Sequence, residues 1–121
     1  MKLRIKGNSV RLRLSKTDVS IICNKGLLKD KTSFGKNIFI YTLESAKDAE
    51  NLSAVFSDSK MTIYIPEIFL KDWEKNDVIG FDNGVKRGSD ELFILVEKDF
   101  QCIDETEEDQ SDNFENPSKA C

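Results

Sequence analysis

The residues best suited to chemistry lie near the start of the chain, where five cations alternate with aliphatic side chains. These cations are Lys2, Arg4, Lys6, Arg11 and Arg13. Side chains alternate between the two faces of a strand, so the cations are expected on one face of a hairpin, opposite its core residues. Those core residues are Leu3, Ile5, Leu12 and Leu14. Arginine and lysine bind phosphate oxygens, which makes this face a candidate polyanion-binding surface. The alternative is a solvated face whose charges only keep a strand soluble.

A second candidate is a metal site near the C-terminal end of the sequence. Its ligands would be Cys102, Asp104, Glu107, Glu108 and Cys121. Zinc accepts thiolate and carboxylate ligands, but no CxxC pair is present. The acidic spacing also departs from the calcium-loop pattern, which needs a central glycine. The alternative is a solvated acidic tail.

The absence of histidine limits the chemistry further. It excludes Ser-His-Asp and Cys-His activation, histidine general bases and imidazole metal ligands. The six glycines are scattered singly and form no phosphate-binding loop. We therefore expect a non-enzymatic protein without a cofactor. A small enzyme or ligand carrier that uses carboxylates and Cys102 at a barrel mouth stays open as an alternative.

The elements that would position these residues occur twice, at a spacing of 51 residues. The apolar positions of the first copy are Leu3, Ile5, Val10, Leu12, Leu14, Val19, Ile22 and Leu27. Those of the second are Ala54, Phe56, Met61, Ile63, Ile65, Leu70, Trp73 and Val78. The spacing changes from period two to helical at the same point in both copies. The pattern predicts two β-β-α-β-β units.

The turn and cap residues set the expected boundaries. In copy one we expect strands Lys2–Lys6 and Val10–Leu14, a helix from the Ser15 cap to about Asn24, and strands Leu27–Phe34 and Asn37–Leu43. In copy two we expect strands Leu52–Phe56 and Lys60–Ile65, a helix from Pro66 to about Lys75, and strands Val78–Phe81 and Glu91–Val96. Core positions are expected for Trp73 and four strand phenylalanines, with Cys23 buried or half-buried. The phenylalanines are Phe34, Phe39, Phe81 and Phe93.

One such unit cannot bury both faces of its hairpins, so the two units should interlock around a single core. The expected fold class is mainly β with two short helices, built as a small swapped-hairpin-like barrel. We expect the barrel to be closed or nearly closed, and closure would remove exposed strand edges. An open meander with an accidental repeat is the alternative.

The segment Met61–Phe81 resembles the AbrB/MazE-type swapped-hairpin barrel. It has an Ile-Pro before a short amphipathic helix, and then Asp77 before the next strand. The opening Gly7–Leu12 is similar to the first hairpin of the antitoxin branch of that family. Two chains exchange hairpins in the family, so the resemblance implies that both halves lie in one chain here. It also implies DNA binding through basic residues on both halves.

Copy two lacks those basic residues. At the matching positions it has Ser53, Val55, Ser57, Thr62 and Tyr64. A palindromic DNA site would therefore need a dimer of chains. The opening Arg4–Leu14 and the ending Val96–Ile103, with its following acidic run, also resemble a group of small uncharacterised bacterial proteins. That second resemblance spans nearly the whole chain and implies no activity.

Charge divides the chain near residue 100. Residues 1–100 hold 17 Lys and Arg against 15 Asp and Glu, whereas residues 101–121 hold one Lys against seven acids. We expect one domain over 1–100, with repeat units at about 1–45 and 51–97, followed by an acidic, flexible tail over 101–121. No apolar run is long enough to cross a membrane, and the N-terminus does not read as a signal peptide. Cytoplasmic localisation is expected.

The expected function is binding of nucleic acid or another polyanion through the basic hairpin. One alternative is a protein-interaction module whose acidic tail engages a basic partner. Another is a small metal- or ligand-binding protein that uses Cys102, Cys121 and the tail carboxylates. A tail that lies on the basic hairpin and masks it would join the first two features. The chain is expected to be a monomer or a homodimer.

Overall fold

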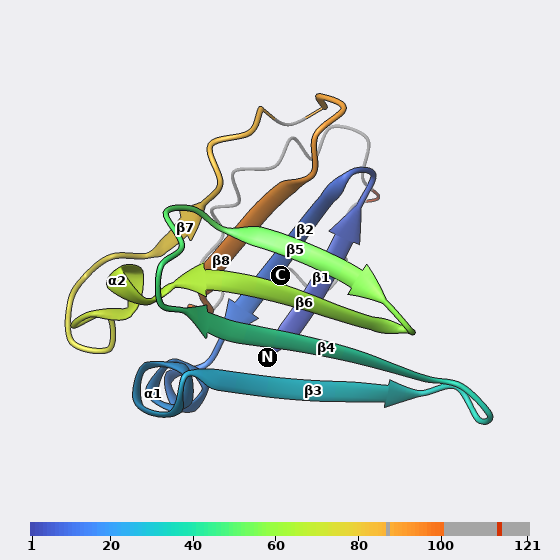
Figure 1. Ribbon diagram of the computed structural model, residues 1–121, viewed down its shortest axis with the longest axis horizontal. Helices are drawn as coiled ribbons and strands as arrows, with labels where there is room; N and C mark the ends of the chain where they lie inside the picture. The colour runs from blue at the N-terminus through green and yellow to red at the C-terminus, as the bar shows by residue number, and fades with distance from the viewer. Residues whose placement is uncertain (87, 101–113, 115–121) are drawn as a thin grey trace.

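In the computed structural model, the described residues are 1–86, 88–100 and 114. They form eight strands and two helices, which confirms the mainly β class (Figure 1). In chain order the elements are β1 Lys2–Lys6, β2 Ser9–Leu14, α1 Lys16–Lys25, β3 Leu27–Ser33, β4 Ile38–Ala46, β5 Ser53–Ser57, β6 Lys60–Pro66, α2 Glu67–Leu70, β7 Gly80–Asp82 and β8 Phe93–Lys98. This order is the predicted β-β-α-β-β plan, written twice.

The two copies exchange hairpins. The strands form two sheets of four, which we call sheet A (β1-β2-β8-β7) and sheet B (β3-β4-β6-β5). Each sheet joins the first hairpin of one copy to the second hairpin of the other, through the parallel pairs β2–β8 and β4–β6. Leu12 is the register partner of Val96 in sheet A, and Ile63 is the register partner of Leu43 in sheet B. Neither copy could build its sheet alone.

The strands do not form a closed barrel. Among the described strands, sheet A ends at β1 and β7 and sheet B ends at β3 and β5, with no ladder joining the sheets. The edges are poorly suited to join. β1 and β3 both carry cations, which repel across a strand pair, and β7 has only three residues. The result is a two-layer sandwich in which the strands of sheet B run across those of sheet A (Figure 1).

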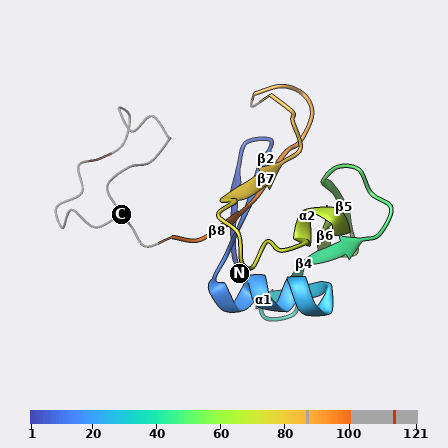
Figure 2. The same ribbon diagram turned by 90° about the vertical axis from the view of Figure 1, so that its left-hand side faces the viewer.

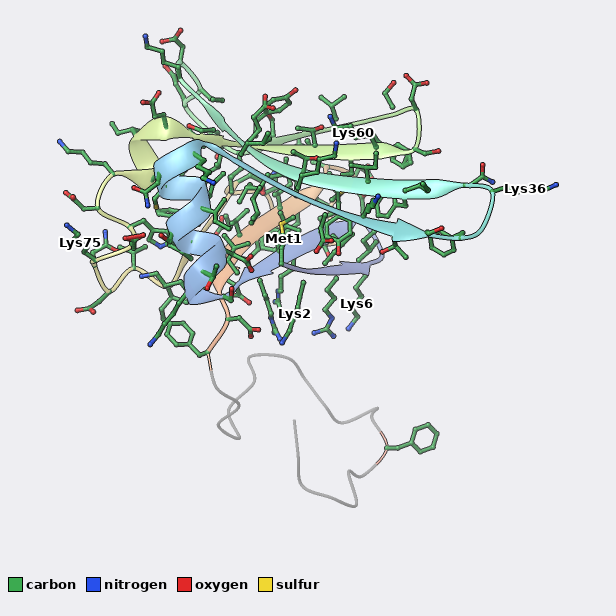
Figure 3. All side chains as sticks on the ribbon, turned by 90° about the horizontal axis from the view of Figure 1, so that it is seen from below. Met1, Lys2, Lys6, Lys36, Lys60 and Lys75 are labelled. Atoms are coloured by element: carbon green, nitrogen blue, oxygen red, sulfur yellow. The ribbon has the colours of Figure 1, made fainter. Side chains whose placement is uncertain are left out.

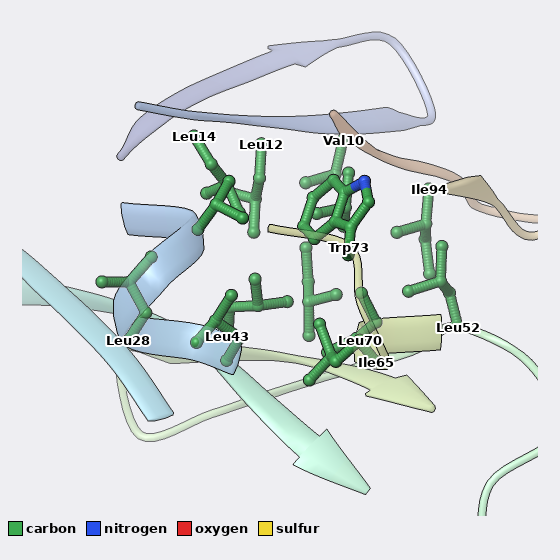
Figure 4. Close-up of a cluster of buried hydrophobic side chains, with 14 of the residues drawn as sticks. Val10, Leu12, Leu14, Leu28, Leu43, Leu52, Ile65, Leu70, Trp73 and Ile94 are labelled. Carbon is green, nitrogen blue, oxygen red and sulfur yellow. The ribbon is translucent and has the colours of Figure 1, made fainter. Parts of the chain in front are cut away.

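The core lies between the layers, with α1 and α2 at one end of the sandwich. α1 spans from one sheet to the other (Figure 2), and the inward side chains of the central strands meet in the interior (Figure 4). The fully covered side chains of the described residues include Leu12, Leu14, Ile22, Leu43, Ile63, Ile65, Trp73 and Val96. Two core predictions are wrong. Ile5 is 60% exposed because it lies near the turn end of the edge strand β1, and Phe34 is 72% exposed because it lies past the end of β3, in the connection to β4.

Local signals set the ends of α1. Ser15 accepts a hydrogen bond from the backbone N–H of Asp18, and the Asp18 carboxylate accepts one from the backbone N–H of Ser15. This reciprocal pair is a capping box. Gly26 ends the helix in the left-handed conformation, with φ of 72°, as predicted.

The second helix is shorter than predicted. It ends at Leu70 instead of about Lys75, because Lys71 is extended and Asp72 has a positive φ of 60°. This turn directs the Trp73 ring into the core, where it is fully buried and its Nε1–H donates to the carbonyl of Val78 at 2.8 Å. The predicted core role of Trp73 is confirmed.

Candidate functional site

The register of the first hairpin places the five cations on one surface. Lys2 lies directly opposite Arg13, and Arg4 lies directly opposite Arg11. Lys6, opposite Ser9, continues the row toward the turn. Lys2 and Lys6 point away from sheet B, into solvent (Figure 3). We call this outer surface of β1 and β2, defined by Lys2, Arg4, Lys6, Arg11 and Arg13, the basic face.

The turn that joins the two strands is held by local bonds. Gly7 has a positive φ of 52°, a conformation that glycine adopts without strain. The Ser9 hydroxyl donates to the carbonyl of Lys6 at 2.7 Å, and the Asn8 side-chain amide donates to the carbonyl of Asp90 at 3.0 Å. The turn is thereby tied to the loop before β8, and this contact holds the end of the first hairpin beside β8.

Two acids, Glu97 on β8 and Asp99 directly after it, lie against the basic face. Glu97 lies beside Arg13 in the parallel ladder, and its Oε1 is 3.2 Å from the Nε of Arg13 and 3.7 Å from the Nε of Arg11. Asp99 contacts the ammonium of Lys2 at 2.7 Å. The five cations therefore outnumber these two acidic partners, and the face keeps an excess of positive charge.

Sequence reasoning missed Glu97 and Asp99. Their signal is the alternation of acid, lysine and acid over residues 97–99, which places both carboxylates on one side of an extended chain. This alternation predicts a contact with the cations only when β8 is known to pair with β2, which lies some 80 residues earlier in the chain. The pairing of β2 with β8 is a property of the exchanged hairpins.

The exposure of the side chains differs along the face. The Lys2 side chain is 74% exposed, whereas that of Arg11 is 13% exposed and that of Glu97 is 20% exposed. The lysine head therefore lies in water beside Asp99, while the arginine next to Glu97 is more covered. A partly covered arginine with a fixed plane suits bidentate contacts with phosphate.

The matching surface of copy two has a different character. Its residues lie on β5 and β6, where serine, threonine, valine and tyrosine replace the cations, as the sequence indicates. Three lysines do lie on the strands of sheet B, at Lys29, Lys31 and Lys60, but they come from other positions of the repeat. The basic face is thus present once in the described part of the chain.

The predicted metal ligands Cys102, Asp104, Glu107, Glu108 and Cys121 lie outside the described residues. Within the described ranges, no group of three or more cysteines and acids is close enough to hold a metal ion. Cys23 is half-buried, as predicted, and its thiol donates to the carbonyl of Leu70 at 3.5 Å. Burial raises the pKa of this thiol, and the nearby charge of Glu74 adds to the effect.

A pocket of about 660 Å³ lies between the end of α1 and the start of α2. Its lining includes Cys23, Lys25, Lys47, Asp48 and Glu67. Charged groups of both signs line it, and the thiol is not activated. These observations indicate no particular class of ligand for the pocket.

A family model matches the chain over residues 1–118. The chain belongs to DUF7009, a family of unknown function. The match spans the exchanged hairpins, the basic face and most of the acidic segment. It is in line with the resemblance to a group of uncharacterised bacterial proteins, whereas the AbrB/MazE resemblance is not confirmed. No curated protein and no solved structure gives a significant match.

No helix in the described ranges is both long enough and apolar enough to cross a membrane.

Proposed function

We propose that the protein binds a polyanion, and specifically the phosphate backbone of a nucleic acid, through the basic face. The observation that carries the proposal is the pairing of like charges, Lys2 opposite Arg13 and Arg4 opposite Arg11. Like charges directly opposite each other destabilise a strand pair. A chain that keeps two such pairs on an outer surface gains most when an anion lies across them.

The spacing of the face suits an extended anion. Alternate residues of a strand lie about 6.7 Å apart, and neighbouring strands lie about 4.8 Å apart. The five cations therefore form a small grid over which several phosphates can be contacted at once. Each neutralised phosphate releases counterions, so the affinity should fall steeply with salt.

Glu97 affects both the stability of the basic face and its affinity for phosphate. By contacting Arg11 at 3.7 Å and Arg13 at 3.2 Å, it orients both guanidinium groups and lowers their mutual repulsion. It also competes with an incoming phosphate for the same donors. Glu97 therefore supports the fold of the empty face and weakens binding.

The resemblance to AbrB/MazE-type proteins favours nucleic acid among the polyanions. In that family, basic residues of exchanged hairpins often contact DNA, and the hairpins here are exchanged between the two copies. We assign the phosphate contacts to Arg4, Lys6, Arg11 and Arg13 because of their charge and their shared face, with Lys2 at the edge of that face. The single basic hairpin per chain is the main departure from the family pattern.

Fluorescence anisotropy with labelled single-stranded DNA, double-stranded DNA and RNA tests the proposal. The full chain is titrated over a range of salt concentrations. We expect binding at low salt, with a slope of log affinity against log salt of about −3 to −4 if three or four phosphates are neutralised.

The matched variants are two double substitutions. Arg4→Ala with Lys6→Ala should reduce the slope by about two, because it removes two cations from the face. Lys29→Ala with Lys31→Ala makes the same change of net charge on the exposed surface of β3 and should leave the slope unchanged. Equal effects of the two pairs would contradict the assignment to the basic face.

The acidic segment after Phe100 needs its own control, because it could occupy the basic face. A full-length variant in which its Asp and Glu residues become Asn and Gln keeps the chain length and removes the charge. If this variant also binds none of the three nucleic acids at low salt, the proposed function is wrong.

A further inference from the structure

The four edge strands differ in how they are protected against pairing with another chain. β1 carries three cations, β3 carries two lysines and an aspartate, and β7 has only three residues and ends at Asp82. Charged side chains and short length are common devices that prevent edge-to-edge association. Of the edge strands in the described part of the chain, β5 alone lacks both devices.

β5 has the sequence Ser-Ala-Val-Phe-Ser, with no charge and no proline. Within the described strands it is hydrogen-bonded to β6 only, so its other edge presents backbone groups outward. Val55 is 53% exposed and Phe56 is 68% exposed. An uncharged edge with exposed apolar side chains is a ready template for strand addition.

We propose that two copies of the chain associate through antiparallel pairing of β5, with the two-fold axis at Val55. The two copies of sheet B would then form one continuous sheet of eight strands. Val55 would lie opposite Val55 of the second copy, and Ala54 opposite Phe56 of the second copy. Ser53 would lie opposite Ser57 of the second copy.

This register is self-complementary. Ala54 is small and Phe56 is large, and both point to the same face of β5, so each phenylalanine ring covers the other copy's alanine. The same face already holds an aromatic contact, since Phe56 stacks on Phe39 with ring centroids 6.3 Å apart. The two serine pairs can exchange hydroxyl hydrogen bonds.

A second copy fits this edge better than a charged partner strand. β5 has no cation to attract an acidic segment and no acid to attract a basic one. Self-pairing at β1 would set cations against cations, because all three charged residues of that strand are basic. Among the described edge strands of five or more residues, β5 is therefore the one that can pair with itself without like charges opposite each other. This inference does not depend on nucleic-acid binding.

The dimer would also change how the basic face is presented. Each copy of sheet A would be related to the other by the two-fold axis, so the pair of chains would carry two basic faces. A two-fold arrangement of contacts matches a palindromic site on a duplex. The missing cations of copy two would be supplied by a second chain.

The first test is the oligomeric state of the full chain by sedimentation and light scattering, from about 1 µM to about 1 mM. Val55→Lys places two like charges at the axis and should raise the dimer dissociation constant by at least about tenfold. Ile38→Lys is the matched control, since Ile38 is 42% exposed on β4, a central strand of the same sheet with a neighbour on each side. It should leave the dissociation constant unchanged.

A second test does not rely on losing the dimer. Paired residues on antiparallel strands have Cα atoms about 4.5 or 5.5 Å apart, and both distances can be spanned by a disulfide. With Cys102 and Cys121 replaced by serine, Val55→Cys should crosslink two chains on mild oxidation, and Ile38→Cys should not. A chain that is monomeric at about 1 mM, a dimer that resists Val55→Lys, or equal crosslinking of the two cysteine variants would each overturn the proposal.

Discussion

Substitution of Glu97 by glutamine should move stability and binding in opposite directions. The carboxylate of Glu97 lies 3.2 Å from the Nε of Arg13 and 3.7 Å from the Nε of Arg11, and glutamine has almost the same shape without the charge. The Arg13 side chain is 40% exposed, so solvent screens its ion pair. We expect a loss of about 0.5–1 kcal/mol in the free energy of unfolding.

The binding change follows from the charge on the basic face. Removing one negative charge leaves one more cation to neutralise a phosphate, which steepens the salt dependence by about 0.9 in slope. Between about 50 and 200 mM salt, that slope corresponds to a further change in affinity of about 3.5-fold. At low salt the variant should bind nucleic acid more tightly than the unmodified chain.

Both quantities can be measured on the same protein. Trp73 is the single tryptophan and is fully buried, so its fluorescence reports urea unfolding. Anisotropy titrations give the salt slope. The control is Glu67→Gln, which changes the net charge equally on the exposed start of α2. If Glu97→Gln weakens binding along with stability, or if Glu67→Gln steepens the slope as much, the reasoning is refuted.

Three further changes test the fold. Thr42 is 1% exposed and its hydroxyl has no hydrogen-bond partner among the described residues, so Thr42→Val should raise the free energy of unfolding by about 1 kcal/mol in urea denaturation. A Cβ on Gly80 would meet the carbonyl oxygen of Val96 at 2.5 Å, so Gly80→Ala should cost about 1–3 kcal/mol, and an unchanged urea midpoint would speak against this contact. At Asp18, burial opposes ionisation, but hydrogen bonds from the N-terminal ammonium and from Ser15 outweigh it and lower the pKa of the carboxyl. The ionised Asp18 carboxylate therefore stabilises the folded state at pH values above the pKa of an unfolded aspartate, and this stabilisation is lost as the pH falls through the lower pKa of the folded state. The stability deficit of Asp18→Asn at about pH 7 should therefore shrink below about pH 4. A deficit independent of pH would exclude this role.

Many elements could be predicted from the sequence because their signals are local. The alternation of Lys2–Lys6 predicts a strand with one charged face, and the structure has that strand at the same bounds. Ser15 and Gly26 predict the two ends of α1, since cap side chains and a left-handed glycine act within one helical turn. The 51-residue repeat predicts two equivalent units around one core. The exchanged hairpins realise that prediction.

Other features could not be predicted because they depend on contacts distant in sequence. The end of α2 at Leu70 depends on the space into which the Trp73 ring turns, and several other strands line that space. The exposure of Ile5 depends on β1 being an edge strand, and that of Phe34 depends on β3 ending at Ser33. A pattern of apolar residues shows which face of a strand is suited to burial, but it does not show which strands become edges or where they end.

For this protein, the sequence by itself determined the strands, the caps of α1, the repeat and the side of the first hairpin that carries five cations. Each of these follows from alternation or capping over a few residues. Only the tertiary structure decided that two sheets stay open instead of closing into a barrel, and that Glu97 and Asp99 lie among those cations. The physical reason is the parallel pairing of β2 with β8, which brings charges from opposite ends of the domain within a few ångströms.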